Sequence, residues 1–126
     1  MRTIEKFVSL AEAEPGSEQV RVRVLFQAQL DDGQSIVVLD DRGWSTSGEW
    51  AQVTPAEIRE TSLVAVGPDE PARGWTPAEE LHAYWEYIRS FLGTQQIHLP
   101  VDVLMNLEHE VRFGPRLQHL LTTAGH

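Results

Sequence analysis

Residues 20–50 read VRVRVLFQAQLDDGQSIVVLDDRGWSTSGEW, and this stretch decides the fold. Its first segment, residues 20–30, has an apolar side chain at every second position, as a strand buried on one face requires. Two aspartate-rich turns, at residues 30–33 and 39–43, flank a second apolar segment at 35–39. The stretch therefore predicts an antiparallel β-meander.

The turn chemistry also predicts which positions of the strands face each other. A two-residue turn at Asp32-Gly33 places Phe26 opposite Leu39, and a second turn at Arg42-Gly43 returns the chain along the sheet. On this register the core face collects Val20, Val22, Val24, Phe26, Val37, Leu39, Trp44 and Trp50. The other face keeps a small apolar island of Leu25, Ile36 and Val38. A slip of one residue in either turn would exchange the two faces.

Helices are predicted after the meander. Residues 77–92 carry an apolar stripe at helical spacing behind a Thr-Pro-Ala-Glu start, and Gly93 is placed to end this helix. The same four letters from Thr54 predict a short helix to about Glu60, followed by a strand at 62–66.

Two further segments are ambiguous in their periodicity. Residues 3–13 favour a short helix, with a strand as the alternative. Residues 97–113 suit either state, and we favour a helix at about 101–108 and an extended segment at 110–113. A last helix is expected to begin at Pro115.

Length and pattern together predict one small domain over residues 1–126. Its expected class is α+β: an antiparallel β-meander of about three to five strands, packed on one face by a long amphipathic helix and by shorter helices. A chain of this length buries enough apolar surface for a core without disulfides, and it contains no cysteine.

Composition narrows the classes of function and the location. The formal net charge of −9 argues against binding to nucleic acid or to anionic membranes. No apolar run is long enough to span a bilayer, and the first residues lack a signal-peptide core. Together with the absence of cysteine, these features predict a cytoplasmic protein. The single lysine, Lys6, among ten basic residues suggests a GC-rich coding genome and therefore a bacterial source.

Polar clusters that could carry chemistry are few. Asp40 and Asp41 mark the second turn, where aspartate is a standard turn residue and also a ligand for divalent cations. His82 and Glu86 lie four residues apart on the long helix, so both could face one ligand. Neither pattern matches a known metal or catalytic motif. We therefore assign no catalytic residue, no metal and no cofactor.

Tryptophans are the other candidates for contact. Trp44 and Trp50 follow the second turn, and Trp75 lies in a proline-rich loop before the long helix. Tryptophan is enriched at binding hot spots, although it is also a large core residue. The binding candidates are thus Trp44, Trp50, Trp75, Asp40, Asp41, His82 and Glu86.

These observations favour a non-catalytic module that binds another protein. The acidic charge suits a basic partner, as in an inhibitor or immunity-type protein. An alternative is a ligand-binding protein or enzyme with a pocket between sheet and helices, using His82, Glu86 and His109 with walls from Tyr84, Trp85 and Tyr87. A third hypothesis is a homodimer through the island of Leu25, Ile36 and Val38.

Overall fold

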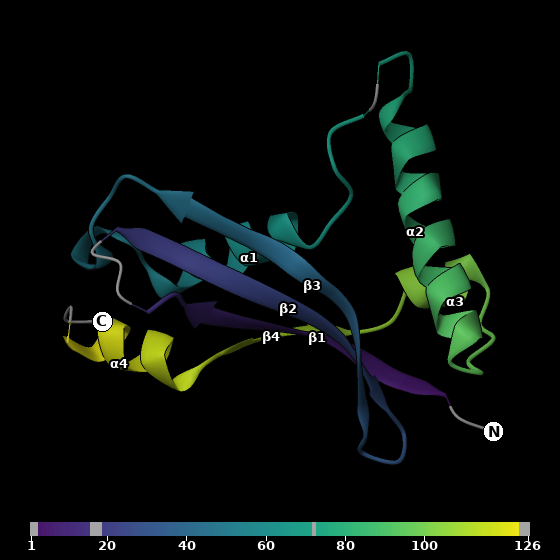
Figure 1. Ribbon diagram of the computed structural model, residues 1–126, viewed down its shortest axis with the longest axis horizontal. Coiled ribbons are helices and arrows are strands. Elements are labelled where there is room, and N and C mark those ends of the chain that lie inside the picture. The colour runs from purple at the N-terminus through teal and green to yellow at the C-terminus, as the bar shows by residue number, and fades with distance from the viewer. Residues whose placement is uncertain (1–2, 16–18, 72, 124–126) are drawn as a thin grey trace.

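Four strands form one mixed sheet in the computed structural model, which describes residues 3–15, 19–71 and 73–123 (Figure 1). The order across the sheet is β3-β2-β1-β4. Strands β1 (Ile4–Ala13), β2 (Val20–Leu30) and β3 (Ser35–Thr46) are antiparallel neighbours, as a meander requires. Strand β4 (His109–Phe113) pairs parallel to β1 and forms the second edge of the sheet.

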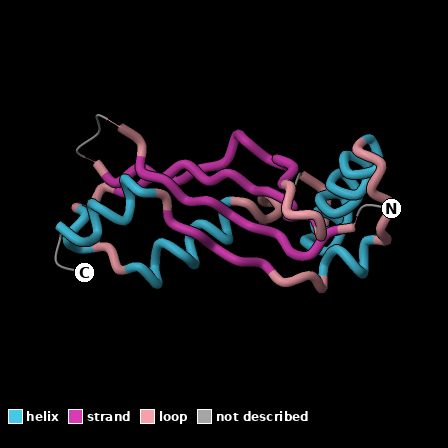
Figure 2. Tube along the Cα trace, turned by 90° about the horizontal axis from the view of Figure 1, so that it is seen from below, coloured by secondary structure: helices cyan, strands magenta, loops and turns pink. Residues whose placement is uncertain are grey.

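Helices fill the long connection from β3 to β4 and follow β4. The connection contains a short 3-10 helix η1 (Trp50–Gln52), then α1 (Pro55–Ala65), α2 (Pro77–Thr94) and α3 (Val101–Met105), and α4 (Pro115–Thr123) comes last. Figure 2 shows the strands as one layer, with α1 beneath it and the α2–α3 pair at the end opposite α4. None of the helices in the described ranges is long and apolar enough to cross a membrane.

The core lies between the sheet and the helices. Alternate residues of β2 are fully buried, including Val20, Val24 and Phe26, so the period-2 pattern of this strand is confirmed. Their partners in the same cluster come from β1 and from every α-helix, namely Phe7, Ala11, Ile58, Ile88, Leu92, Leu104, Leu117 and Leu121. The α+β class and the packing of helices on one face of the sheet agree with the sequence.

Several local predictions are also confirmed. Phe26 pairs with Leu39 as predicted, although the two-residue turn at Asp32-Gly33 was wrong. The N–H of Leu30 donates to the carbonyl of Gln34, so three residues form the turn, and a register shift between Phe26 and Gln27 restores the pair. Thr76 accepts a hydrogen bond from the backbone N–H of Glu79, and the Glu79 side chain accepts one from Thr76, so α2 begins with a complete capping box. The short α3, the extended β4 and the last helix from Pro115 also lie where the sequence placed them.

The prediction of a helix at residues 3–13 was wrong, because these residues form β1. This strand lies inside the sheet between β2 and β4, and its consecutive residues Phe7, Val8 and Ser9 are all buried. Its core-facing residues are Phe7, Ser9, Ala11 and Ala13, whereas Val8 and Leu10 lie on the other face. Because apolar residues occur on both faces and a register irregularity separates Ile4 from Lys6, the apolar residues imitated helical spacing.

Three boundaries also differ from the prediction. Strand β3 runs without a turn through Arg42-Gly43 to Thr46, and residues 62–66 continue helix α1 to Ala65 instead of forming a strand. Helix α2 passes through Gly93, and the chain leaves it at Gln95 and Gln96, the latter with φ 66°. In each case the strand or helix is longer than the local sequence pattern predicted, because a glycine or an apolar run within it did not end it.

Two irregularities in the β2–β3 register change which residues of β3 around Val37 and Val38 face the core, whereas Leu39 and Trp44 stay on the predicted face. Register shifts between Phe26 and Gln27 and between Val24 and Phe26 leave extra residues on β3, as β-bulges do. Val38 is therefore buried in the core at 6% exposure, whereas Val37, predicted to be buried, is 42% exposed. Ile36 packs against the core from the helix side, opposite Ala28.

The proposed dimer island does not form a single patch. Leu25 pairs with Leu10 on the sheet face away from the helices, whereas Val38 belongs to the buried core. The three residues Leu25, Ile36 and Val38 thus do not share one face.

Candidate functional site

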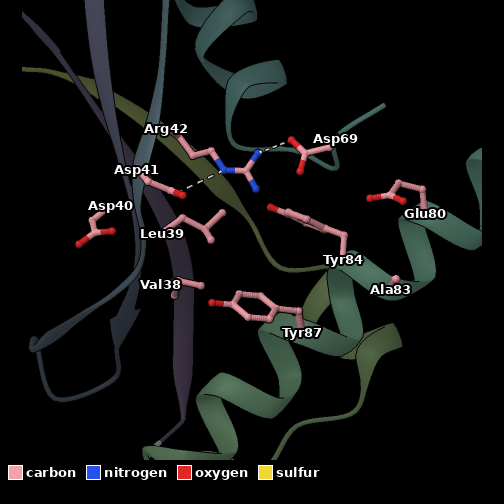
Figure 3. Close-up of a pocket in the computed structure, with 10 residues that line it drawn as sticks. All are labelled: Val38, Leu39, Asp40, Asp41, Arg42, Asp69, Glu80, Ala83, Tyr84 and Tyr87. Carbon is pink, nitrogen blue, oxygen red and sulfur yellow. Dashed lines mark hydrogen bonds and ion pairs between the residues drawn. The ribbon is translucent and has the colours of Figure 1, made fainter. Parts of the chain in front are cut away.

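A groove lies between β3 and α2 and gathers charged and aromatic side chains (Figure 3). It encloses about 390 Å³. Five consecutive residues of β3, one loop residue and one face of α2 line it, namely Val38, Leu39, Asp40, Asp41, Arg42, Asp69, Glu80, Ala83, Tyr84 and Tyr87. We call this the β3–α2 groove.

The two walls of the groove follow from the bulges of β3 and from the helical spacing of residues on α2. The two bulges of β3 lie in the stretch that lines the groove, and bulges bend an edge strand and redirect its side chains. On the other wall, Glu80, Tyr84 and Tyr87 are spaced by three or four residues, so they point from one face of α2 toward the strand (Figure 3).

Arg42 fastens three elements at the inner end of the groove. Its guanidinium Nη1 lies 3.4 Å from the carbonyl oxygen of Ala65, 3.3 Å from that of Gly67 and 3.0 Å from the Asp69 carboxylate. The side chain is 20% exposed. A cation at the last carbonyls of α1 also complements the negative end of the helix dipole. Arg42 therefore holds the end of α1 and the following loop against β3.

Tyr84 completes this anchor from α2. Its hydroxyl donates a hydrogen bond to the carbonyl of Val66, between the two carbonyls that Arg42 binds. Burial raises the pKa of Tyr84 to about 12, and the nearby Arg42 partly opposes this effect. The hydroxyl is thus a neutral donor at physiological pH.

Carboxylates dominate the mouth of the groove. The Asp41 side chain is 79% exposed and lies 3.7 Å from Nε of Arg42, and the Asp69 side chain is 75% exposed. Glu80 projects from α2 toward the groove on the other side of Tyr84 (Figure 3). Asp40 lines the rim, but its carboxylate points away from the groove (Figure 3). Asp41 and Asp69 pair with the Arg42 guanidinium, and Asp40 and Glu80 add further negative charge, so the lining of the groove carries a surplus of negative charge.

Two of the candidate tryptophans lie away from the groove, where they pack against the core. Trp44 is half-buried, and its indole N–H donates to the hydroxyl of the buried Ser62 of α1 at 3.0 Å. Trp50 is half-buried at the start of η1. Both residues connect the end of the meander to the helical layer.

The remaining candidates lie on other sides of α2. Trp75, 47% exposed, and His82 line a separate and largely apolar hollow of about 390 Å³ together with Ala78, Glu79 and Ala83. Glu86 is engaged by Arg89, whose Nη2 lies 2.7 Å from its carboxylate, and this hydrogen bond lowers the pKa of Glu86. His82 and Glu86 therefore lie outside the β3–α2 groove.

His109 forms a contact that the sequence did not predict. Its Nε2 lies 2.6 Å from Oγ of Ser9, which is fully buried, and its ring meets that of Phe26 edge-on at 5.2 Å. Burial lowers the pKa of His109. Ser9 has no exposed surface, whereas the His109 ring is only partly buried. The pair satisfies a buried hydroxyl.

The enzyme-like set of His82, Glu86 and His109 is thus not brought together by the fold. Of its expected walls, Tyr84 and Tyr87 line the β3–α2 groove, and Trp85 packs 5.9 Å from the ring of Phe7. In the ranges that the structure describes, no group of three or more histidine or carboxylate side chains is placed to hold a metal ion.

Sequence reasoning found Asp40 and Asp41 but missed the residues that come to them from far along the chain. The signal for α2 was present, because Glu80, Tyr84 and Tyr87 share one helical face. No sequence pattern indicated that this face opposes β3. Comparison with protein-family models, curated proteins and solved structures gives no match for this chain.

Proposed function

We propose that this protein is a non-catalytic binding module that takes a cationic side chain of a basic protein partner in the β3–α2 groove. The observation that carries the proposal is the set of three carboxylates, Asp41, Asp69 and Glu80, around a groove walled by two tyrosines. The net charge of −9 adds long-range attraction for such a partner.

The chemistry of the walls suits an arginine or lysine of the partner. The carboxylates offer hydrogen-bond acceptors to its head group, and the ring of Tyr87, a residue 58% exposed, offers a face for its charge and for its aliphatic stem. Val38 and Leu39 provide apolar surface below. Arg42 provides an internal precedent, since its guanidinium already lies between Asp41 and Asp69.

Binding is favoured over catalysis by the side chains available. The described residues lining the groove include no serine, cysteine, histidine or lysine, and three of its carboxylate and phenol groups already have partners: Asp41 and Asp69 pair with Arg42, and Tyr84 donates to Val66. A volume of about 390 Å³ also lies within the range of small-ligand pockets. A small organic cation would therefore compete with the partner's side chain for the same acceptors.

The test is calorimetric titration with a hexa-arginine peptide at low and at high salt. The variant Asp41→Asn/Glu80→Gln removes two groove carboxylates while keeping the shape of each side chain. Its matched control, Asp31→Asn/Glu60→Gln, changes the net charge equally at exposed positions outside the groove. We expect the groove variant to bind at least several-fold more weakly than the control, because only it loses local acceptors.

The salt series separates local contacts from general attraction. High salt should weaken binding to every variant, because exposed charges are screened. Equal affinities of the groove variant and its control at both salt concentrations would refute the groove as the site. They would leave only the overall charge as the cause of binding.

A further inference from the structure

We propose that two copies of this chain pair antiparallel through the outer edge of β4, with a two-fold axis at Val111, to form one continuous eight-stranded sheet. This inference is independent of the proposed function, because it concerns the opposite edge of the sheet. It starts from the orientation of the backbone groups of β4.

Hydrogen bonds to β1 at both ends of β4 fix that orientation. The N–H of Phe7 donates to the carbonyl of Glu108 at 2.9 Å, and the N–H of Gly114 donates to the carbonyl of Ala11 at 2.8 Å. Since backbone groups alternate along a strand, the even-numbered residues of β4 turn their peptide groups toward β1. Those of His109, Val111 and Phe113 turn outward.

A separate contact supports the outward orientation of the odd-numbered residues of β4. The carbonyl of Phe113 accepts a hydrogen bond from Nε2 of Gln118 at 2.7 Å, as an outward-facing carbonyl can. A carbonyl oxygen has two lone pairs, so this contact leaves room for a second donor. Strand β4 thus presents a row of backbone donors and acceptors on an edge of the sheet, which is the usual template for pairing with another strand.

The two edges of the sheet differ in their protection. Strand β3 carries two bulges together with Asp40 and Asp41, and both features discourage edge-to-edge pairing. Strand β4 pairs with β1 over five residues without a register shift, so its outer edge is regular. An apolar hollow of about 430 Å³ lies beside it, lined in part by Val111, Phe113 and Pro55. This hollow offers surface that a second copy would cover.

The sequence of β4, His-Glu-Val-Arg-Phe, then selects a second copy and one register. With the axis at Val111, each Val111 faces its counterpart and exchanges both backbone hydrogen bonds. Glu110 of one copy then lies opposite Arg112 of the other, and the same pair repeats across the axis. Opposite charges that face each other across two antiparallel strands stabilise the pair.

The neighbouring registers are disfavoured by the same charges. Moving the two-fold axis by one residue along β4 still pairs the outward backbone groups of the two copies. With the axis at Glu110, the two Glu110 side chains face each other, and with the axis at Arg112, the two Arg112 side chains do. Like charges directly opposite are destabilising. Within one copy, Nε of Arg112 already donates to Glu110 at 2.6 Å, and Lys6 lies 3.3 Å from the same carboxylate. In the dimer, the charged side chains Lys6, Glu110 and Arg112 of one copy would continue into Glu110 and Arg112 of the other, with positive and negative charges alternating.

The test uses two single charge reversals and their mixture, followed by sedimentation velocity over a concentration series. Glu110→Arg and Arg112→Glu should each give a monomer, since each places like charges across the axis. An equimolar mixture of the two variants should form a heterodimer, because every pair across the axis is then again opposite in charge. Circular dichroism verifies that each variant is folded.

A second variant tests the backbone contacts without a change of charge. Val111→Pro removes an outward N–H that makes no bond to β1, and proline is tolerated at such an edge position. It should also give a folded monomer. A wild-type protein that stays monomeric at every concentration would overturn the proposal. So would reversal variants that remain dimers, or a mixture that remains monomeric.

Discussion

At the scale of single residues, the buried pair of Ser9 and His109 makes stability depend on pH. The pKa of His109 is lowered by burial, so the folded protein holds this proton less tightly than the unfolded chain does. Between the ordinary histidine pKa of about 6.5 and the lower folded pKa, the unfolded state therefore binds more protons. The contribution of His109 to stability is complete above its pKa in the unfolded chain, and it is lost as the pH falls through its pKa in the folded protein.

We expect the free energy of unfolding of the wild-type protein, measured with urea, to be lower at about pH 5 than at about pH 7.5. His109→Gln keeps a donor for Ser9 but has no proton to gain, so it should flatten this dependence. His119→Gln, at an exposed position, is the control and should retain the wild-type slope. A slope that survives in His109→Gln would assign the effect to other groups.

At the scale of elements, Glu12 joins the end of β1 to the start of α4. Its carboxylate accepts hydrogen bonds from the backbone N–H of Leu117 at 2.7 Å and of Ala13 at 2.8 Å. A negative charge at the first turn of α4 also complements the helix dipole. The carboxylate reaches this place because Gly114 is buried there without a side chain.

Gly114→Ala should therefore destabilise the protein by about 0.5–2 kcal/mol, the range for loss of a helix N-terminal cap, because the Glu12 carboxylate must move away from the backbone N–H groups of α4. A Cβ at this position would overlap the Glu12 carboxylate. Gly114 does not have a positive φ, so the cost is steric rather than conformational. Urea unfolding measures the change in the free energy of unfolding, and Gly67→Ala, whose added Cβ would lie 3.4 Å from its nearest neighbour, serves as control.

The source of this cost can be isolated with a double-mutant cycle. In a Glu12→Ala background the added methyl group meets no carboxylate, so Gly114→Ala should cost less there than in the wild type. Equal costs in both backgrounds would show that the glycine is required for another reason.

The elements that the sequence predicted well are those with one dominant pattern. The alternation in β2, the capping box of α2 and the proline at the start of α4 each act locally, and each lies where it was expected. The prediction for β1 failed because apolar residues lie on both faces of the strand and a register irregularity separates Ile4 from Lys6. The turn predicted at Arg42-Gly43 failed because an edge strand tolerates polar residues and bulges. These outcomes depend on neighbours that are distant in sequence.

In the candidate site, too, local patterns were predicted from the sequence and contacts between distant segments were not. Asp41 was found because it is adjacent to a recognisable pattern, but its companions Asp69 and Glu80 acquire meaning only when α2 lies against β3. Likewise, the partnership of Ser9 and His109 exists only because β4 returns beside β1 after a connection of more than sixty residues. Sequence identified residue types, and the topology determined which of them meet.

At the scale of the whole molecule, the two proposed contact surfaces lie on opposite edges of the sheet. The β3–α2 groove adjoins β3, and the proposed pairing edge is β4, with β2 and β1 between them. Neighbouring strands are spaced by about 4.8 Å, so about 14 Å of packed sheet separates the outer strands. Coupling between the two surfaces would require an element with two arrangements that both surfaces bias.

Helix α1 reaches from Arg42 at the groove to the hollow beside β4. Because the described fold shows this helix in a single arrangement, we expect the two events to be independent. Hexa-arginine should bind wild-type protein and the Val111→Pro variant with the same affinity in calorimetry, and a saturating amount of peptide should leave the dimerisation constant unchanged. Val111→Pro is suited to this comparison because it keeps the net charge. Tighter binding to the dimer would mean that the second copy contributes to the groove, and by linkage the peptide would then strengthen dimerisation by the same factor.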